Sequence, residues 1–141
     1  MKLLFIATIL SFSFACANAA TSIPLDLVGI WATEDSEFKG EALWKGQALY
    51  LDTDGIGVGV GGDGTHVGGF RIVLTSYSPK TNVITFDLTD NGKVVASKVL
   101  SYDPILKIIF SPTDSKQRYH RRFDGISISM RKSIGLEEKV K

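Results

Sequence analysis

The fold is decided by residues 82–100, which read NVITFDLTDNGKVVASKVL. Ile84, Phe86 and Leu88 alternate with polar residues, and this period of two places them on one face of a β-strand. The segment Asp90-Asn91-Gly92 follows directly and can adopt the positive φ angles of a tight hairpin turn. A second run of β-branched residues comes after the turn. The segment therefore predicts a β-hairpin of two antiparallel strands.

Similar short runs, separated by turn residues, recur along the chain, whereas helical periodicity is nearly absent. We expect strands near residues 27–34, 42–52, 56–61, 68–77, 83–89, 93–102, 105–111, 117–123 and 126–131. Only the tail at 135–141 could add a helical turn or two, and a frayed end is the alternative there. So many short strands in sequence order predict an all-β protein, an antiparallel up-and-down meander that curls into a barrel of about eight strands. A two-sheet β-sandwich is the alternative.

Glycine is concentrated in one of the expected strands, around residues 54–64 (DGIGVGVGGDG). Alternation places the glycines at 55, 57, 59 and 61 on one face and the β-branched residues between them on the other. A bare face allows another strand or a large ring to approach the backbone closely, or allows the strand to bend. On this basis Gly59→Val is expected to impair folding more than Asp63→Ala.

The same glycines also fit two ligand-binding patterns. Residues 59–64 match G-x-G-x-x-G, but a dinucleotide site needs a helix directly afterwards, and here the strand-like FRIVLTSY follows. As a calcium loop, DTDGIGVG lacks the closing Glu and flanking helices, and in GGDGTHV, His66 stands where a β-roll has its ligand Asp. We therefore expect strand and turn structure here, and no cofactor or metal.

The first residues, MKLLFIATILSFSFACANAA, have the layout of a secretory signal peptide, with Lys2, an apolar stretch and a small-x-small cleavage site at Ala17-Asn18-Ala19. We expect a signal peptide over 1–19, a single barrel domain over 20–134 and a tail over 135–141. The exported protein would be periplasmic or secreted. Alternatively, a lipoprotein would keep Cys16 as its lipidated first residue, but that processing prefers an aliphatic residue where Ser13 stands.

Composition limits the partners of the mature chain. Loss of Lys2 leaves fifteen basic and fifteen acidic residues, so the mature chain is formally neutral, which argues against nucleic-acid binding. No second apolar run is long enough to span a bilayer, so no stable membrane insertion is expected after signal removal. Residues 26–63 are mainly acidic and 116–132 mainly basic. Two such faces can steer a protein partner or can simply be solvated.

The sequence provides no catalytic motif. His66 and His120 are the only histidines, and neither has a second histidine or a carboxylate at ligand spacing. Glu34, Asp35, Glu37 and Glu41 cluster after the first expected strand and could supply a carboxylate pair, but a solvated loop explains them better. We therefore expect no catalytic, cofactor-binding or metal-binding residues and no enzymatic activity.

A basic stretch, residues 116–123 (KQRYHRRF), interleaves arginines with aromatic residues. Such a mixture can stack on and pair with anions, sugars or nucleic acid. In a strand, Tyr119, Arg121 and Phe123 would share one face. The simpler interpretation is an edge strand protected by its charges.

Residues 28–34 (VGIWATE) place Gly29-x-Trp31 on the first expected strand, and this resembles the Gly-x-Trp signature of lipocalin-like (calycin) barrels. The resemblance implies that Trp31 closes the base of a barrel and that a basic side chain from a late strand packs over its ring. Arg121, Arg122 and Arg131 are the candidates. The chain is shorter than a typical lipocalin, so no binding residue is transferred.

A closed barrel of about eight strands either fills its interior with side chains or holds one small ligand. The sequence therefore favours a module of the cell envelope that binds a small apolar or amphipathic ligand. The alternative is a protein-interaction module, such as an envelope inhibitor or an immunity-type protein, which uses its acidic and basic faces.

Overall fold

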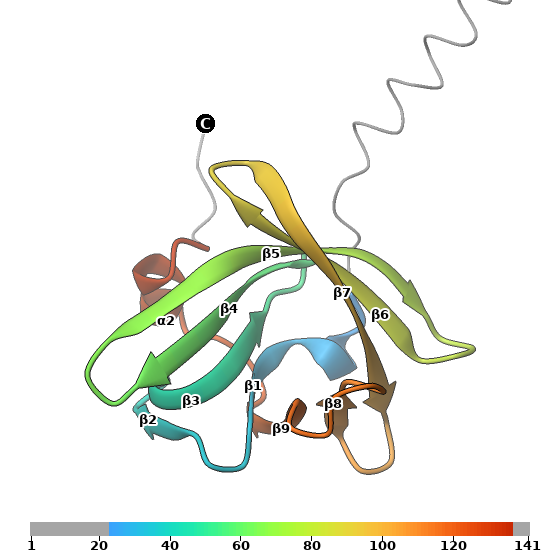
Figure 1. Cartoon of the computed structure of the whole chain (residues 1–141), viewed down its shortest axis with the longest axis horizontal. Helices are drawn as coiled ribbons and strands as arrows, with labels where there is room; N and C mark the ends of the chain where they lie inside the picture. Colours follow the sequence, from blue (N-terminus) through green and yellow to red (C-terminus); the bar gives the residue numbers. More distant parts are fainter. Residues whose placement is uncertain (1–22, 137–141) are drawn as a thin grey trace, which may run out of the picture.

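The computed structural model describes residues 23–136 and shows an antiparallel β-barrel (Figure 1). The elements in chain order are η1 (Leu25–Leu27), β1 (Gly29–Ala32), β2 (Glu37–Lys39), β3 (Ala42–Leu51), β4 (Ile56–Asp63), β5 (Val67–Ser78), β6 (Val83–Asp90), β7 (Lys93–Asp103), β8 (Ile108–Phe110), β9 (Arg118–Phe123) and α2 (Ile128–Ser133).

The barrel is closed by the first strand. From β3 to β9 each strand pairs with the next, and β1 then joins β9 to β3, with Trp31 opposite both Arg121 and Leu49. Of the nine described strands, β2 pairs only with β3, so eight form the ring. The prediction of an antiparallel meander closing into a barrel is confirmed, and the sandwich alternative is wrong because the ring leaves one continuous sheet.

The hairpin predicted from residues 82–100 is formed by β6 and β7. Asn91 has a φ of 52° and Gly92 a φ of 80°, the positive angles of a tight turn that matches the twist of the strands. Asp90 and Lys93 are the last paired residues before this turn. In Figure 1 the tip of the hairpin projects beyond the body of the barrel.

The inner core consists of the alternate residues of each strand that point into the barrel. Trp31, Ile84 and Ile109 are fully buried there. They pack in one cluster with Ile23, Leu27, Val28, Leu49, Leu51, Ile72, Leu74, Phe86, Leu100, Tyr102 and Tyr119. The burial of this apolar surface drives closure, because each strand has its apolar face on the inside.

A second apolar cluster lies outside the barrel, against the outer face of β1, β3 and β4. Ile30 and Ala32 are its most buried members, followed by Tyr50. Figure 1 shows α2 lying on the outside of the barrel, and Ile126, Met130 and Ile134 from this segment belong to the same cluster. One part of the sheet is therefore apolar on both faces.

The strand predicted over 126–131 is wrong, because this segment leads into α2. Ser127 is the N-cap of the helix, and its hydroxyl accepts a hydrogen bond from the Met130 N–H at 3.2 Å. The helix leaves Ile128 80% exposed and turns Ile126, Met130 and Ile134, which are four residues apart, toward the outer cluster. The same residues fit both a strand and a helix. The helix forms because it buries Ile126, Met130 and Ile134 against the apolar outer face of the barrel.

The glycine-rich strand β4 has the alternation expected from the sequence. Ile56, Val58 and Val60 belong to the outer cluster, so the glycines face the interior. Among Gly57, Gly59 and Gly61, close approach occurs only at Gly57, where a Cβ would overlap the carbonyl oxygen of Tyr50. At Gly59 the nearest atoms, from Ile72 and Leu49, would be 3.8 Å away. The physical premise for a severe folding defect in Gly59→Val is therefore absent.

The predicted signal peptide over 1–19, with Cys16, lies outside the described residues, as does most of the tail, 137–141. Among residues 23–136, the only α-helix is α2, and no helix has the length and apolar character needed to cross a bilayer.

Candidate functional site

The base of the barrel is closed by Trp31 and η1. The Trp31 indole N–H donates a 3.0 Å hydrogen bond to the Leu27 carbonyl, which ties the ring to η1. The ring of Tyr102 packs edge-on against the indole, with 5.9 Å between the ring centroids. Aromatic pairs favour this geometry. This end of the interior is therefore filled.

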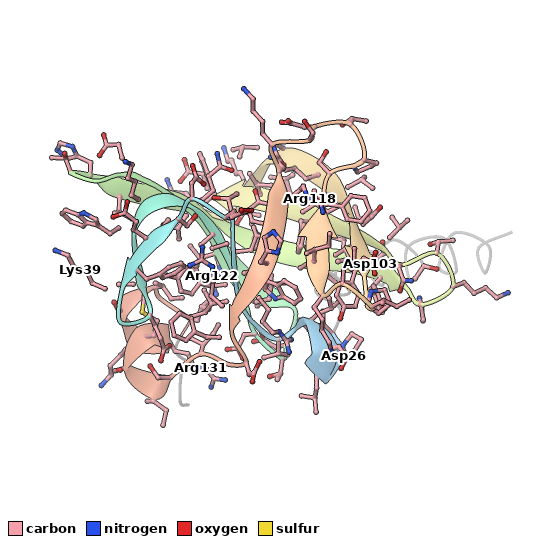
Figure 2. All side chains as sticks on the ribbon, turned by 90° about the horizontal axis from the view of Figure 1, so that it is seen from below. Asp26, Lys39, Asp103, Arg118, Arg122 and Arg131 are labelled. Atoms are coloured by element: carbon pink, nitrogen blue, oxygen red, sulfur yellow. The ribbon has the colours of Figure 1, made fainter. Side chains whose placement is uncertain are left out.

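Arg121 is the basic residue that packs over Trp31. Its guanidinium lies 4.9 Å from the centre of the indole ring and donates hydrogen bonds to the carbonyls of Leu25, Asp26 and Val28. Figure 2 labels Asp26, the middle residue of η1. Arg121 thus satisfies carbonyl groups around η1 and adds a cation–π contact.

The other two arginine candidates have different roles. Arg122 donates to the carbonyls of Thr33, Glu34 and Ser36 and holds the segment before β2. Arg131 pairs with the Asp52 carboxylate at 2.9 Å and ties α2 to the end of β3. Both are labelled in Figure 2.

The basic stretch is not an edge strand. β9 pairs with β1 on one side and β8 on the other, so the edge-strand interpretation is wrong. Tyr119 and Arg121 share one face, as expected, and this is the inner face. Phe123 instead packs outside against Phe38, because an irregularity in the β1–β9 register shifts the strand at this point.

Tyr102 has a buried hydroxyl without a hydrogen-bond partner among the described residues. Burial, with a smaller contribution from Asp26, raises the pKa of Tyr102. The folded state therefore holds the proton more tightly than the unfolded chain does. This contribution to stability is complete below the ordinary tyrosine pKa of about 10 and is lost as the pH rises through the folded value.

We predict that Tyr102→Phe increases the free energy of unfolding by about 1 kcal/mol at neutral pH, because it removes an unsatisfied buried hydroxyl. The variant should also lose less stability than the wild type as the pH rises above about 10, because it has no hydroxyl to ionise at this position. Tyr50→Phe is the matched control: the Tyr50 hydroxyl donates to the Glu41 carbonyl at 2.6 Å and accepts from the Leu43 N–H at 3.1 Å. Urea denaturation should show that this control is less stable than the wild type. A less stable Tyr102→Phe protein would contradict the prediction.

The opposite end of the barrel is hollow. A cavity of about 200 Å³ lies above the packed base and reaches the mouth of the barrel, where Phe70 is 46% exposed. Its apolar lining comes from six strands: Leu49, Gly59, Gly61, Phe70, Ile72, Phe86, Leu88, Leu100 and Tyr119. Gly59 and Gly61 have no side chains to fill this space, so the glycine face of β4 forms one wall of the cavity.

One side of the mouth is polar. Lys98 on β7 donates a 3.3 Å hydrogen bond from Nζ to Oε1 of Gln117, and Tyr119 donates a 3.3 Å bond from its hydroxyl to Oε1 of Gln47. All four residues line the cavity. Burial, and to a smaller extent Asp114, raises the pKa of Tyr119, so its hydroxyl keeps its proton at neutral pH.

The histidines considered from the sequence lie apart from this cavity. His66 is in the turn between β4 and β5, where the Asp63 carboxylate accepts the backbone N–H of His66 and of Thr65. These two bonds lower the pKa of Asp63 and show that this carboxylate stabilises the turn. His120 is on β9 opposite Ala32 and Ile108.

The acidic cluster does not form a carboxylate pair. Asp35 accepts the Thr33 hydroxyl at 2.9 Å, and Glu41 accepts the Ser127 N–H at 3.0 Å. Glu34 and Glu37 are exposed. Within residues 23–136, no three His, Cys, Asp or Glu side chains gather in a way that could hold a metal ion.

Comparison of the chain with models of protein families, with curated proteins and with solved structures finds no match. The closed barrel and its cavity therefore carry the functional argument.

Proposed function

We propose that this small β-barrel binds one small apolar or amphipathic molecule in the cavity opposite its closed base. The observation that carries the proposal is the unequal filling of the interior. Trp31 and its neighbours pack the base, whereas the glycines of β4 leave about 200 Å³ open at the mouth. Protein cores are otherwise close-packed, so an apolar space of this size next to solvent is a natural ligand site.

The volume limits the size of the ligand. An engineered apolar cavity of about 150 Å³ in another protein holds benzene, whereas pockets for drug-sized ligands measure roughly 300–1,000 Å³. A cavity of about 200 Å³ therefore suits a group the size of one substituted ring or a short alkyl chain. A long acyl chain would have to extend past Phe70 into solvent.

The resemblance to lipocalin-like barrels supports the same function. That resemblance implies a tryptophan at the base under a basic side chain from a late strand, and Trp31 and Arg121 stand in this relation. If residues 1–19 are removed on export, the ligand is met in the periplasm or outside the cell.

Calorimetric titration with toluene and para-methylbenzyl alcohol tests the proposal. The wild type is expected to bind at least one of these ring-sized probes, and Gly59→Val is expected to weaken binding about tenfold or more, because its methyl groups enter the cavity. The matched control is Gly68→Val on β5: no atom lies within 4 Å of its Cβ position, and Gly68 does not line this cavity. Equal binding by all three proteins, or no binding by the wild type, would overturn the proposal.

A further inference from the structure

The polar side of the cavity mouth determines what kind of head group a ligand can carry. Lys98, Gln117, Gln47 and Tyr119 come from β7, β3 and the chain at and just before β9. The apolar lining from β4, β5 and β6 faces them across the cavity. A ligand in this space would therefore have its apolar body against the glycine strand and its neighbours, and one end among two amides and an ammonium group.

The ammonium group of Lys98 lies at this mouth without an ion pair among the described residues. Within residues 23–136 the ion pairs are Arg121–Asp124 and Arg131–Asp52, so Lys98 has a neutral amide as its partner and no carboxylate. An acidic group that contacts the lining is Asp114, whose carboxylate accepts a 3.5 Å hydrogen bond from Nε2 of Gln117. Lys116 and Arg118 line a neighbouring surface pocket together with Gln47, Glu34 and Asp35, so charges of both signs lie beside the mouth. Figure 2 shows Arg118 at the end of β9 away from Asp26.

The side-chain amides of Gln117 and Gln47 can donate hydrogen bonds to an anion in the cavity. Gln117 accepts from Lys98 through Oε1. Its Nε2 makes only the long 3.5 Å bond to Asp114, and rotation of the side-chain amide would exchange that bond for one to the ligand. The structure assigns no acceptor among the described residues to Nε2 of Gln47, whose Oε1 is used by Tyr119. A planar head group with two acceptor oxygens suits a cavity lined by one ammonium group and two amides, because charge-assisted hydrogen bonds are stronger than neutral ones.

We infer that the ligand is a small amphipathic anion, an apolar group the size of one ring that carries a carboxylate held by Lys98 with Gln117 and Gln47. This inference rests on the proposed function and adds the charge of the ligand to it. Lys98 is exposed at the mouth, so solvent screens its charge, and the preference for an anion is expected to be about three- to tenfold.

Three probes that share one ring test the inference: para-methylbenzoate, para-methylbenzyl alcohol and para-methylbenzylamine. Calorimetric titrations at neutral pH and low salt should rank the wild-type affinities as anion, then neutral alcohol, then cation. Lys98→Met should remove the preference for the anion and change the affinity for the alcohol much less than that for the anion. Lys98→Arg should keep the preference. Lys93→Met, on the same strand but at the hairpin turn, is the matched control and should bind all three probes like the wild type.

The outcomes separate this inference from the proposed function. Tight binding of the alcohol with no preference for the anion, or a preference that survives Lys98→Met, would overturn the head-group assignment and leave the apolar cavity as a ligand site. Failure of all three probes to bind the wild type, while toluene also fails, would overturn both. Added salt should weaken the binding of the anion and leave that of the alcohol unchanged, which checks that charge causes the difference.

Discussion

Trp31→Ala is expected to lower the free energy of unfolding by about 4 kcal/mol, the largest effect of any single side-chain truncation in this barrel. Trp31 is fully buried, and its removal takes away the Leu27 hydrogen bond, the contact with Tyr102 and the surface on which Arg121 lies. Domains are stable by roughly 5–15 kcal/mol, so this loss would leave the folded state marginal. Urea denaturation followed by circular dichroism measures it.

Trp44→Ala is the matched control for this prediction. Trp44 is the other tryptophan of the chain, lies partly exposed on β3 and has the ammonium group of Lys39 4.0 Å from its ring centre. Its truncation removes the same atoms from a solvated surface and should cost about 1 kcal/mol or less. Equal losses at the two positions would show that Trp31 does not close the base.

Gly57→Ala is expected to lower the free energy of unfolding by about 3 kcal/mol, whereas Gly59→Ala should leave it unchanged or raise it by about 0.5 kcal/mol. The methyl group at 57 would overlap the Tyr50 carbonyl oxygen, a backbone atom that cannot move without disturbing the β3–β4 pairing. At 59 the same methyl group lies 3.8 Å from two side chains, which is an ordinary contact distance. Alanine also lowers the conformational entropy of the unfolded chain, which favours the folded state slightly.

The two glycines lie two residues apart on the same strand and face, so both substitutions change the strand propensity equally. A difference in stability between the two variants therefore reports the space around each added methyl group. Denaturation of both proteins by urea is the measurement. If Gly59→Ala destabilised as much as Gly57→Ala, the cavity wall described at Gly59 would be wrong, since the added methyl group would then have met packed atoms.

The sequence was sufficient for eight of the nine described strands because side-chain alternation and turn residues act locally. The short strand β2 (Glu37–Lys39) was not predicted. The β6–β7 hairpin follows from Asn91-Gly92 and the apolar residues around it. The choice of Arg121 among three arginines could not be made in this way. It depends on the β1–β9 register, which sets Arg121 opposite Trp31, and register between distant strands has no local signal.

The helix α2 was missed because two periodicities overlap in the same residues. Ile126, Ile128 and Met130 alternate as in a strand, whereas Ile126, Met130 and Ile134 are spaced as on one side of a helix. The outer cluster that the helix covers forms only when the barrel closes. Packing of the segment against the outer cluster therefore selects the helix, because the local sequence fits a strand and a helix about equally well.

The candidate site was only partly visible in the sequence. The pattern placed the β4 glycines on one face but did not show that this face borders a cavity. The alternation in β7 did contain a signal for Lys98. Lys98 is two residues before Leu100 and four before Tyr102, so it lies on the same, inner face of the strand. Gln47 and Gln117 carried no signal of their own, since exposed glutamines occur on most surfaces and their convergence requires β3 and β9 to meet across β1.

Diffraction from a crystal of the protein pressurised with xenon tests most directly whether the barrel is hollow opposite its base. Xenon binds apolar cavities of this size without needing a head group. The account predicts a xenon atom inside the barrel, within contact of Gly59, Ile72 and Phe86. Side chains filling that space, with no xenon between them, would contradict it.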